Sequence, residues 1–131
     1  MTILIGYVPT PEGDAALTHG LAEAATRGDD VVVLNSPRRG STVDTDFVDE
    51  DTASSLVERA RAEGVKATVE QPEHGADIVE TFEKLIEQTG ASLVVIGLRR
   101  RSPVGKLVTG SDAQRLLLEL DVPVLAVKPA R

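Results

Sequence analysis

The sequence contains no cysteine and no tryptophan, and its aromatic residues are two phenylalanines and one tyrosine. Without cysteine the chain has no disulfide framework, no thiolate nucleophile and no cysteine-based zinc site. Its two histidines, His19 and His74, do not have the spacing of a metal-binding pair on a helix. So few aromatic side chains exclude a stacking platform for single-stranded nucleic acid. We therefore expect no metal ion bound as part of the fold and no nucleic-acid partner.

Positive charge is also scarce, because 14 lysines and arginines face 21 acidic residues and give a net charge of −7 at pH 7. Such a chain lacks the broad basic surface that binds DNA or anionic membranes. The opening MTILIGYVPTP is typical of a strand rather than a signal peptide, and no apolar run approaches the ~20 residues of a membrane span. We predict a cytoplasmic protein.

Short apolar runs alternate with amphipathic helical patterns along the 131 residues, a length that fits one domain, 1–131. This alternation predicts right-handed βαβ units, and hence an α/β doubly wound parallel sheet with helices on both faces. Glycines at 28, 64 and 90 are expected to stop the first three helices. The predicted strands are 3–8, 31–34, 65–69, 93–96 and 122–127, and the predicted helices are 11–27, 51–63, 76–88 and 111–120.

The helix predicted at 111–120 should turn its apolar residues toward the sheet, and these are Ala113, Leu116, Leu117 and Leu120. The polar stretch 35–49 is too long for a tight loop, so we expect it to be flexible or to form part of a site.

The stretch 97–111, GLRRRSPVGKLVTGS, holds four positive charges and no negative one, against the acidic background. Ligands of open α/β sheets bind beyond the carboxyl ends of the strands, and this stretch leaves the end of the fourth strand. Gly97 would turn the backbone out of the sheet, while Gly110 and Ser111 would offer free N–H groups at a helix start to a phosphate. The charge would come from Arg99, Arg100, Arg101 and Lys106.

Other interpretations of this stretch stay open. The arginines could serve solubility or an acidic partner, Gly97 could be a packing residue, and Gly110 could be a simple helix start. A P-loop is excluded, because Arg100 and Leu107 stand where that motif needs glycine and a hydroxyl residue. A dinucleotide-binding G-x-G-x-x-G sequence does not follow the first strand either.

The stretch resembles the universal stress protein family, whose members carry Gly-x2-Gly-x9-Gly-Ser/Thr at this place. Gly97, Gly110 and Ser111 match, and Arg100 replaces the second glycine. The opening ILIGYVPTPEGDAAL and the terminal DVPVLAVKP extend the resemblance over the whole chain. It implies an adenine nucleotide α-hydrolase-like fold, with a five-stranded sheet in the order 3-2-1-4-5, a homodimer and, in one branch, bound ATP.

Carried over by position, the resemblance implies that Gly97, Arg100, Gly110 and Ser111 face the phosphates. The end of the first strand with Val8, and Asn35 with Ser36 after the second, would face adenine and ribose. Many nucleotide-binding relatives have an aspartate where this chain has Val8. Asp112 could help to hold Mg2+ or complement the helix dipole, and we favour the dipole.

Three functions follow from this sequence. We predict a regulatory adenine-nucleotide-binding protein, with ATP or a related nucleotide as ligand and no rapid turnover, since no catalytic constellation is legible. The second is a partner-binding stress protein of the same fold that ignores nucleotides, supported by Val8 and Arg100. The third, which we rate lowest, is an enzyme acting at the phosphates of ATP.

We also predict a homodimer that pairs through the apolar edge strand Val122 to Val127. Pro123 and Pro129 offer the opposite interpretation, because prolines blunt sheet edges.

Overall fold

The computed structural model describes residues 1–35, 49–71, 77–98 and 111–129, apart from the side chains of Ser111 and Asp112. Strands and helices alternate through these ranges, as the apolar periodicity predicts. In chain order the elements are β1 (Thr2–Tyr7), α1 (Pro11–Arg27), β2 (Asp30–Asn35), α3 (Glu50–Ala62), β3 (Ala67–Glu70), α4 (Ile78–Thr89), β4 (Ala91–Gly97), α5 (Ser111–Glu119) and β5 (Val124–Val127).

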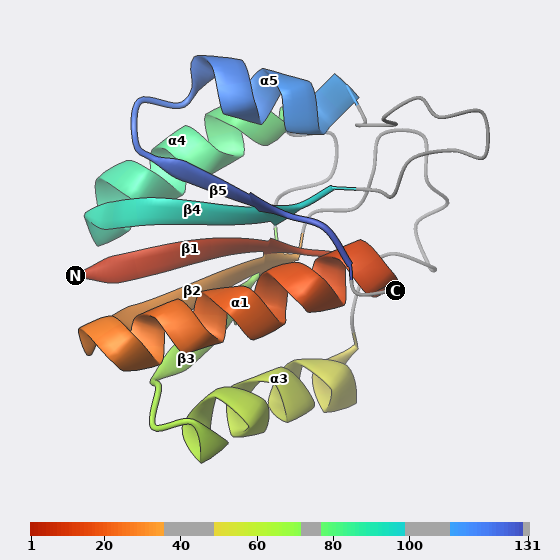
Figure 1. The fold of residues 1–131 in the computed structure, drawn as a ribbon, viewed down its shortest axis with the longest axis vertical. Helices are drawn as coiled ribbons and strands as arrows, with labels where there is room; N and C mark the ends of the chain where they lie inside the picture. The colour runs from red at the N-terminus through yellow and green to blue at the C-terminus, as the bar shows by residue number, and fades with distance from the viewer. Residues whose placement is uncertain (36–48, 72–76, 99–110, 130–131) are drawn as a thin grey trace.

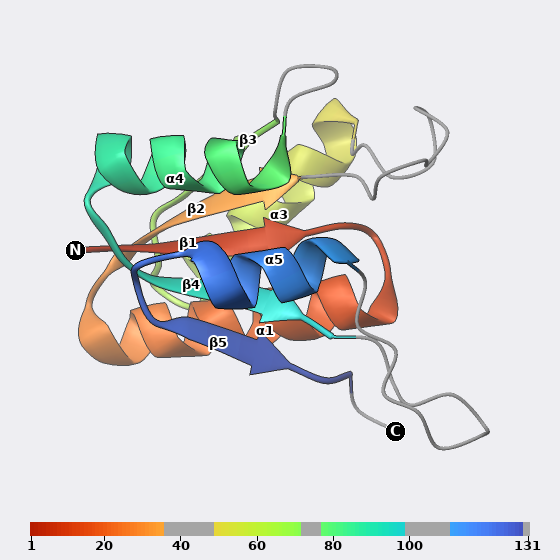
Figure 2. The ribbon, with the colours of Figure 1, turned by 90° about the horizontal axis from the view of Figure 1, so that it is seen from above.

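The strands form one five-stranded sheet in the order β3-β2-β1-β4-β5, and every pairing is parallel. Helices α1 and α3 cover one face, and α4 and α5 cover the other (Figures 1 and 2). The predicted fold class and strand order are confirmed. Because the strands are parallel, their carboxyl ends meet at a single edge, which we call the carboxyl edge. The amino terminus lies at the opposite edge, and β5 ends at the carboxyl edge (Figure 1).

Local signals fix the helix boundaries. At the start of α1, the Thr10 side chain accepts a hydrogen bond from the Gly13 amide, and Pro11 takes the first helical position. The helix ends at Gly28, whose φ of 72° lies in the left-handed region that favours glycine. Gly90 ends α4 in the same way, with a φ of 70°. The stops predicted at these two glycines are confirmed.

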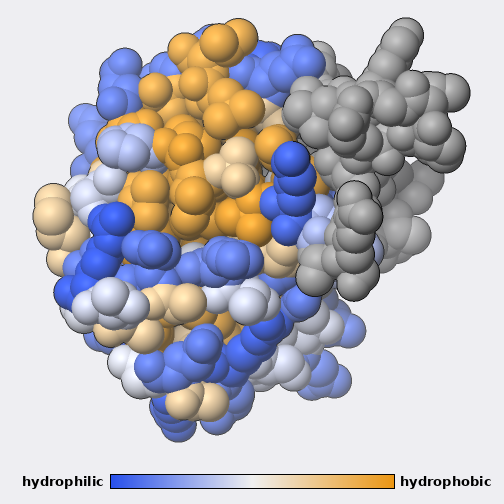
Figure 3. Space-filling view, in the orientation of Figure 1, coloured by the Kyte–Doolittle hydropathy of each residue, from blue (hydrophilic) through white to orange (hydrophobic). Residues whose placement is uncertain are grey.

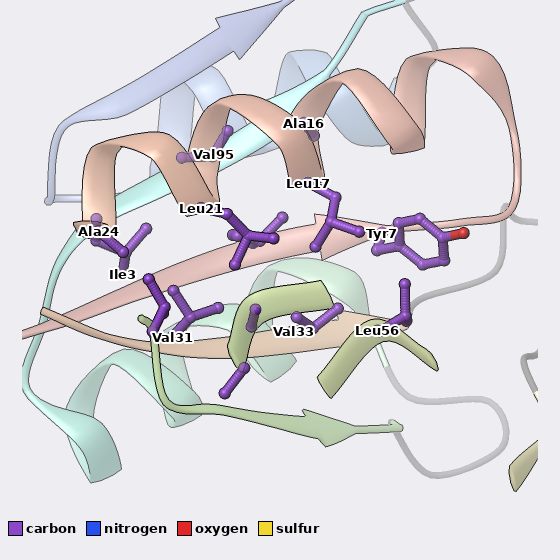
Figure 4. Close-up of a cluster of buried hydrophobic side chains, with 14 of the residues drawn as sticks. Ile3, Tyr7, Ala16, Leu17, Leu21, Ala24, Val31, Val33, Leu56 and Val95 are labelled. Atoms are coloured by element: carbon purple, nitrogen blue, oxygen red, sulfur yellow. The ribbon is translucent and has the colours of Figure 1, made fainter. Parts of the chain in front are cut away.

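The sheet is apolar on both faces, as a covered parallel sheet must be. Successive residues of β1 alternate between two cores: Ile3 and Ile5 face α1 and α3, whereas Leu4 faces α4 and α5. Figure 4 shows the first core, in which Leu17 and Leu21 of α1 lie against the strands. Both helices that follow β1 and β2 therefore rest on a continuous apolar layer.

Several boundaries and one orientation differ from the sequence predictions. Strand β1 covers Thr2–Tyr7, so Val8 lies just after it, and β4 starts at Ala91 rather than at residue 93. Strand β3 starts at Ala67 rather than at residue 65, although Val65 is buried just before it. Strand β5 starts at Val124, two residues after its predicted start. Leu117, predicted to face inward, is 41% exposed. Leu116 and Leu120, four residues apart, point to the sheet, and Leu117 lies about 100° round the helix from Leu116.

In the part of the chain that the structure describes, no helix combines the length and the apolar character needed to cross a membrane.

Candidate functional site

The candidate site is the carboxyl edge, where β1, β2 and β4 end and where α1 and α5 begin (Figure 1). The structure places the predicted residues Val8, Asn35 and Gly97 there, and α5 begins at Ser111, as predicted. Asp112 is the second residue of that helix. The other predicted site residues lie outside the described part of the chain, and they are Ser36, Arg99, Arg100, Arg101, Lys106 and Gly110.

The first turn of α1 is pressed against the ends of β1 and β4. A Cβ atom on Gly13 would lie 1.9 Å from the Val8 carbonyl oxygen, and one on Gly97 would lie 2.0 Å from the Glu12 carbonyl oxygen. Gly97 has no positive φ. The structure therefore explains this glycine by close packing, the alternative interpretation of the sequence, and not by a turn that needs left-handed backbone.

Val8 lies in the short connection from β1 to α1 and is half-buried. Its carbonyl oxygen accepts a hydrogen bond of 2.7 Å from the Thr10 amide, which closes the turn that leads into α1. The valine side chain can offer a ligand an apolar surface but no hydrogen bond. Any polar contact to a ligand at this position must therefore come from the backbone or from a neighbouring side chain.

Asn35 is fully buried, and among the described residues it is the one buried polar or charged side chain. Its Nδ2 donates to the Tyr7 carbonyl oxygen at 3.1 Å, and its Oδ1 accepts from Nε2 of Gln71 at 3.1 Å. These bonds join the ends of β1, β2 and β3 and fix the orientation of the buried amide. A buried amide is tolerated where its hydrogen bonds are made.

Sequence reasoning missed Gln71. The signal that could have found it is the strand register, because Glu70 pairs with Leu34 and the next residues along the two strands are Gln71 and Asn35. That the Asn35 side chain faces a nucleoside stays a prediction. The structure adds that this side chain holds three strand ends together at the same edge.

Tyr7 was also missed, although the single tyrosine of the chain stands at the last position of β1. Its ring is buried beside Leu17 and Leu56, and Figure 4 shows the hydroxyl pointing past the end of β1. Burial raises the pKa of the phenol, nearby Asp14 raises it further, and Arg59 opposes them. Tyr7 is therefore a neutral hydrogen-bonding group at physiological pH.

Two Arg–Asp pairs join helices next to this edge. On one face of the sheet, Arg59 of α3 contacts Asp14 of α1 at 2.7 Å and also donates to the Thr18 hydroxyl. On the other face, Arg115 of α5 binds both carboxylate oxygens of Asp77, at 2.7 and 3.1 Å. Each pair bridges two neighbouring helices.

Asp77 also caps α4, since its carboxylate accepts the Glu80 amide at 3.2 Å. The hydrogen bonds from Arg115, and then that amide, hold the pKa of Asp77 below its usual range. Asp77 and Glu119 in turn raise the pKa of Arg115, so the pair stays charged across the physiological pH range.

The described residues hold no group of three or more His, Cys, Asp or Glu side chains placed to bind a metal ion. The groups that this edge can present to a ligand are the backbone N–H groups at the start of α5, the exposed side chain of Gln71 and the neutral phenol of Tyr7. Such groups bind anions and polar heterocycles by hydrogen bonds.

Comparison with known proteins decides the family. The profile of the Universal stress protein family matches residues 1–128. A universal stress protein of Mycolicibacterium smegmatis is 41% identical over 127 residues, which cover 97% of each chain. The chain belongs to the universal stress protein family.

Solved structures of the family share the architecture described above. A universal stress protein from Archaeoglobus fulgidus is 30% identical, with a TM-score of 0.80 and 98% of each chain covered. A universal stress protein from the same organism was solved in complex with dAMP, and it is 25% identical with a TM-score of 0.72 and 98% of each chain covered. The fold of this chain is therefore an adenine nucleotide α-hydrolase-like fold.

Proposed function

We propose that this chain is a regulatory adenine-nucleotide-binding protein of the cytoplasm, which binds ATP or a related nucleotide and does not turn it over rapidly. The observation that carries the proposal is the position of the α5 N-terminus. This N-terminus lies at the carboxyl edge. It follows β4 in the chain, the strand whose last residue, Gly97, packs against α1. The dAMP complex of the Archaeoglobus fulgidus protein supports an adenine nucleotide as the ligand class.

Topology gives the physical reason for a ligand at this place. The chain leaves β1 for α1 on one face and reaches β5 through α5 on the other, so the strand order reverses between β1 and β4. At such a switch point the neighbouring connections diverge, and a crevice opens beyond the strand ends. The first turns of α1 and α5 flank it. Thr10 already caps the start of α1, so α5 is the helix start whose backbone N–H groups we propose as the ligand contact.

The proposed ligand lies across this edge. Its phosphates meet Ser111 and Gly110, with Mg2+ carried by the phosphates when ATP binds, and its nucleoside extends over the ends of β1 and β2. Neighbouring strands are about 4.8 Å apart, so the distance from β4 to β2 is about 10 Å, comparable to the length of a nucleotide. Asp112 complements the α5 dipole. In addition to Gly97, the proposed contacts are Arg99, Arg100, Arg101 and Lys106 for the phosphates, and Val8, Asn35 and Ser36 for the nucleoside.

Calorimetric titration of the purified chain with AMP, ADP and ATP, with and without Mg2+, tests the proposal. We expect micromolar affinity for at least one of them, as measured heat and as nucleotide released from freshly purified, denatured protein. The Gly110→Val variant should lose binding, because its side chain crowds the phosphate path. The Arg100→Gly variant should bind equally well or better. Silence of the wild type at millimolar concentration, or unchanged binding by Gly110→Val, overturns the proposed site.

Turnover is tested separately by phosphate release from ATP. The described residues bring no nucleophile and base together at the carboxyl edge, so we expect no sustained release. Continuous release that disappears in Ser111→Ala would assign an enzymatic function instead.

A second candidate is a protein of this fold that acts through dimerisation and protein partners. The apolar edge formed by β5 and α5 favours a role for self-association. Leu118 is 84% exposed, and Leu117 and Leu125 are also exposed. Figure 3 shows apolar residues gathered over the part of the surface that α5 and β5 occupy in Figure 1. We propose a homodimer through Val122 to Val127, in which a second copy covers this patch.

Sedimentation velocity tests the dimer with Leu125→Lys, which places a charge in the middle of the edge strand. We expect a dimer for the wild type and a monomer for the variant. Thr68→Lys is the matched control, because Thr68 is an exposed residue of β3, the other edge strand of the sheet. A monomeric wild type at micromolar concentration overturns the dimer. A dimer without any nucleotide affinity would favour the second candidate over the first.

A further inference from the structure

Helix α5 is held on the molecule by few side chains. It has nine residues, too few for a stable helix on its own in water. Of its described side chains Leu116 is buried, Leu120 is buried just after its end, and Leu117 and Leu118 are exposed. Its position must therefore depend on specific contacts with the rest of the protein.

The strongest polar contact of α5 is the bidentate pair between Arg115 and Asp77. Each guanidinium NH2 group donates to a different carboxylate oxygen, at 2.7 and 3.1 Å, a geometry that fixes orientation as well as distance. Arg115 also donates from Nε to Glu119, one turn further along its own helix, at 3.2 Å. The guanidinium is therefore held from two sides.

Asp77 is itself a fixed point. Its carboxylate caps α4, and its backbone oxygen accepts hydrogen bonds from the amide and the hydroxyl of Thr81, at 3.0 and 2.8 Å. Helix α4 in turn is anchored in the core by Val79 and Phe82, which are buried. The pair thus ties α5 to a rigid part of the fold.

The Asp77–Arg115 pair lies near the N-terminal end of α5, which is the end that is proposed to bind the ligand. Arg115 is one turn from Ser111, the first residue of the helix, and side chains of helices point back toward their N-terminus. Helices α4 and α5 both begin at the carboxyl edge and run away from it (Figures 1 and 2). The Asp77–Arg115 bonds therefore join the N-terminal ends of two neighbouring helices at the edge where the nucleotide is proposed to bind.

We propose that the Asp77–Arg115 pair positions the N-terminus of α5 and thereby sets the affinity for the phosphate of the ligand. Both are positioning residues that act through the helix start. The inference rests on the proposed nucleotide function and deepens it, because it assigns phosphate affinity to a pair outside the glycine-containing stretch.

The chain offers a matched control. Arg59 and Asp14 form an equally short ion pair, 2.7 Å, between α3 and α1 on the opposite face. Helix α1 is long and is seated by six buried residues, so its position does not depend on that pair. Replacing either arginine with alanine removes one ion pair between helices. Only the Arg115 pair involves α5.

The experiment measures the affinities of the full chain for AMP and for adenosine. We expect Arg115→Ala to weaken AMP binding by about fivefold to twentyfold, a usual range for residues that act at a distance from the ligand. Adenosine, which lacks the phosphate, should change by less than about twofold. Arg115→Lys, which keeps the charge but loses the two-pronged geometry, should fall between Arg115→Ala and the wild type. Arg59→Ala should leave both ligands unchanged.

Asp77→Ser separates the two tasks of Asp77, because serine also caps helices but cannot bind the guanidinium bidentately. It should match Arg115→Ala, and the double variant should lose no more than either single one, which shows that they act as a pair. If Arg115→Ala and Asp77→Ser bind AMP as tightly as the wild type does, this inference is overturned and the proposed function still stands. Equal weakening of adenosine also overturns it, since that indicates general loosening. A wild type that binds no AMP overturns the proposed function and, with it, the inference.

Discussion

The two faces of the sheet hold their helices in different ways. Helix α1 is fixed by shape, with six buried residues and a first turn so close to the strands that Gly13 and Gly97 leave no room for a Cβ. Helix α5, on the other face, is fixed by a small apolar contact and one bidentate ion pair. The proposed site lies between the N-terminal ends of these helices. Steric contact positions α1, whereas α5 depends on a polar contact that a single substitution can remove.

The difference between the two faces can be tested by truncating one leucine on each and measuring the free energy of unfolding. Leu21 of α1 is fully buried, and Leu21→Ala should lower the free energy of unfolding by about 2–5 kcal/mol through lost burial and a residual cavity. Leu118 of α5 is 84% exposed, and Leu118→Ala should change it by less than about 0.5 kcal/mol. Urea unfolding of both variants checks this, at a concentration low enough to keep the chain monomeric. Similar losses would contradict it.

The steric character of the α1 face is tested by Gly97→Ala. The added Cβ would meet the Glu12 backbone at 2.0 Å, so α1 or β4 must shift, and we expect a loss of about 1–3 kcal/mol. Gly28→Ala is the control, because no atom lies within 4 Å of its would-be Cβ and its cost comes from a positive φ, about 1 kcal/mol. If crystals of Gly97→Ala show α1 in an unchanged position, the close approach does not explain this glycine.

Acid should weaken the polar contact on the α5 face. The lowered pKa of Asp77 means that the unfolded chain binds its proton at a higher pH than the folded chain does. The stability from this group is therefore present at neutral pH and is lost as the pH falls below about 4. Unfolding measured against pH for the wild type and Asp77→Ser should give curves that differ at pH 7 and converge in acid. Curves that stay parallel would contradict the role of the Asp77 charge.

The smallest effect is expected at alkaline pH, on the α1 face. The raised pKa of Tyr7 means that the unfolded chain loses the phenolic proton first. Stability from the neutral phenol is therefore intact below pH about 10 and declines as the pH rises above it. Because the chain has one tyrosine and no tryptophan, its ultraviolet absorbance titrates Tyr7 directly. A midpoint at or below 10 in the folded chain, or the same alkaline decline in Tyr7→Phe, would contradict this.

Most of the fold could be predicted because its signals are local. The apolar runs, the helical periodicity, and the glycines at 28 and 90 each depend on a few neighbouring residues. The strand order came from the resemblance to a family, since periodicity alone does not tell which strands are neighbours. The inward orientation of Leu117 was wrong because α5 lies at the β5 side of the sheet, where a narrower apolar stripe is covered.

The site was harder to predict, because its parts meet through tertiary contacts. That Gly97 is required by the Glu12 backbone depends on how α1 is seated on β4, eighty-five positions later in the sequence. The Gln71–Asn35 bond depends on the register of β2 and β3, and Asp77–Arg115 on the packing of α4 against α5. A single sequence carries no direct signal for such pairs.

The two ends of the described chain lie on opposite sides of the molecule, and this has a practical consequence for protein engineering. The amino group of Met1 lies at the edge away from the proposed site, paired with Asp29 at 3.2 Å, whereas β5 ends beside it (Figure 1). A fluorescent reporter fused before Met1 leaves the carboxyl edge open and gives up the ion pair between the terminal amino group and Asp29. The same reporter fused after β5 would stand next to the strand ends, where its bulk competes with a ligand.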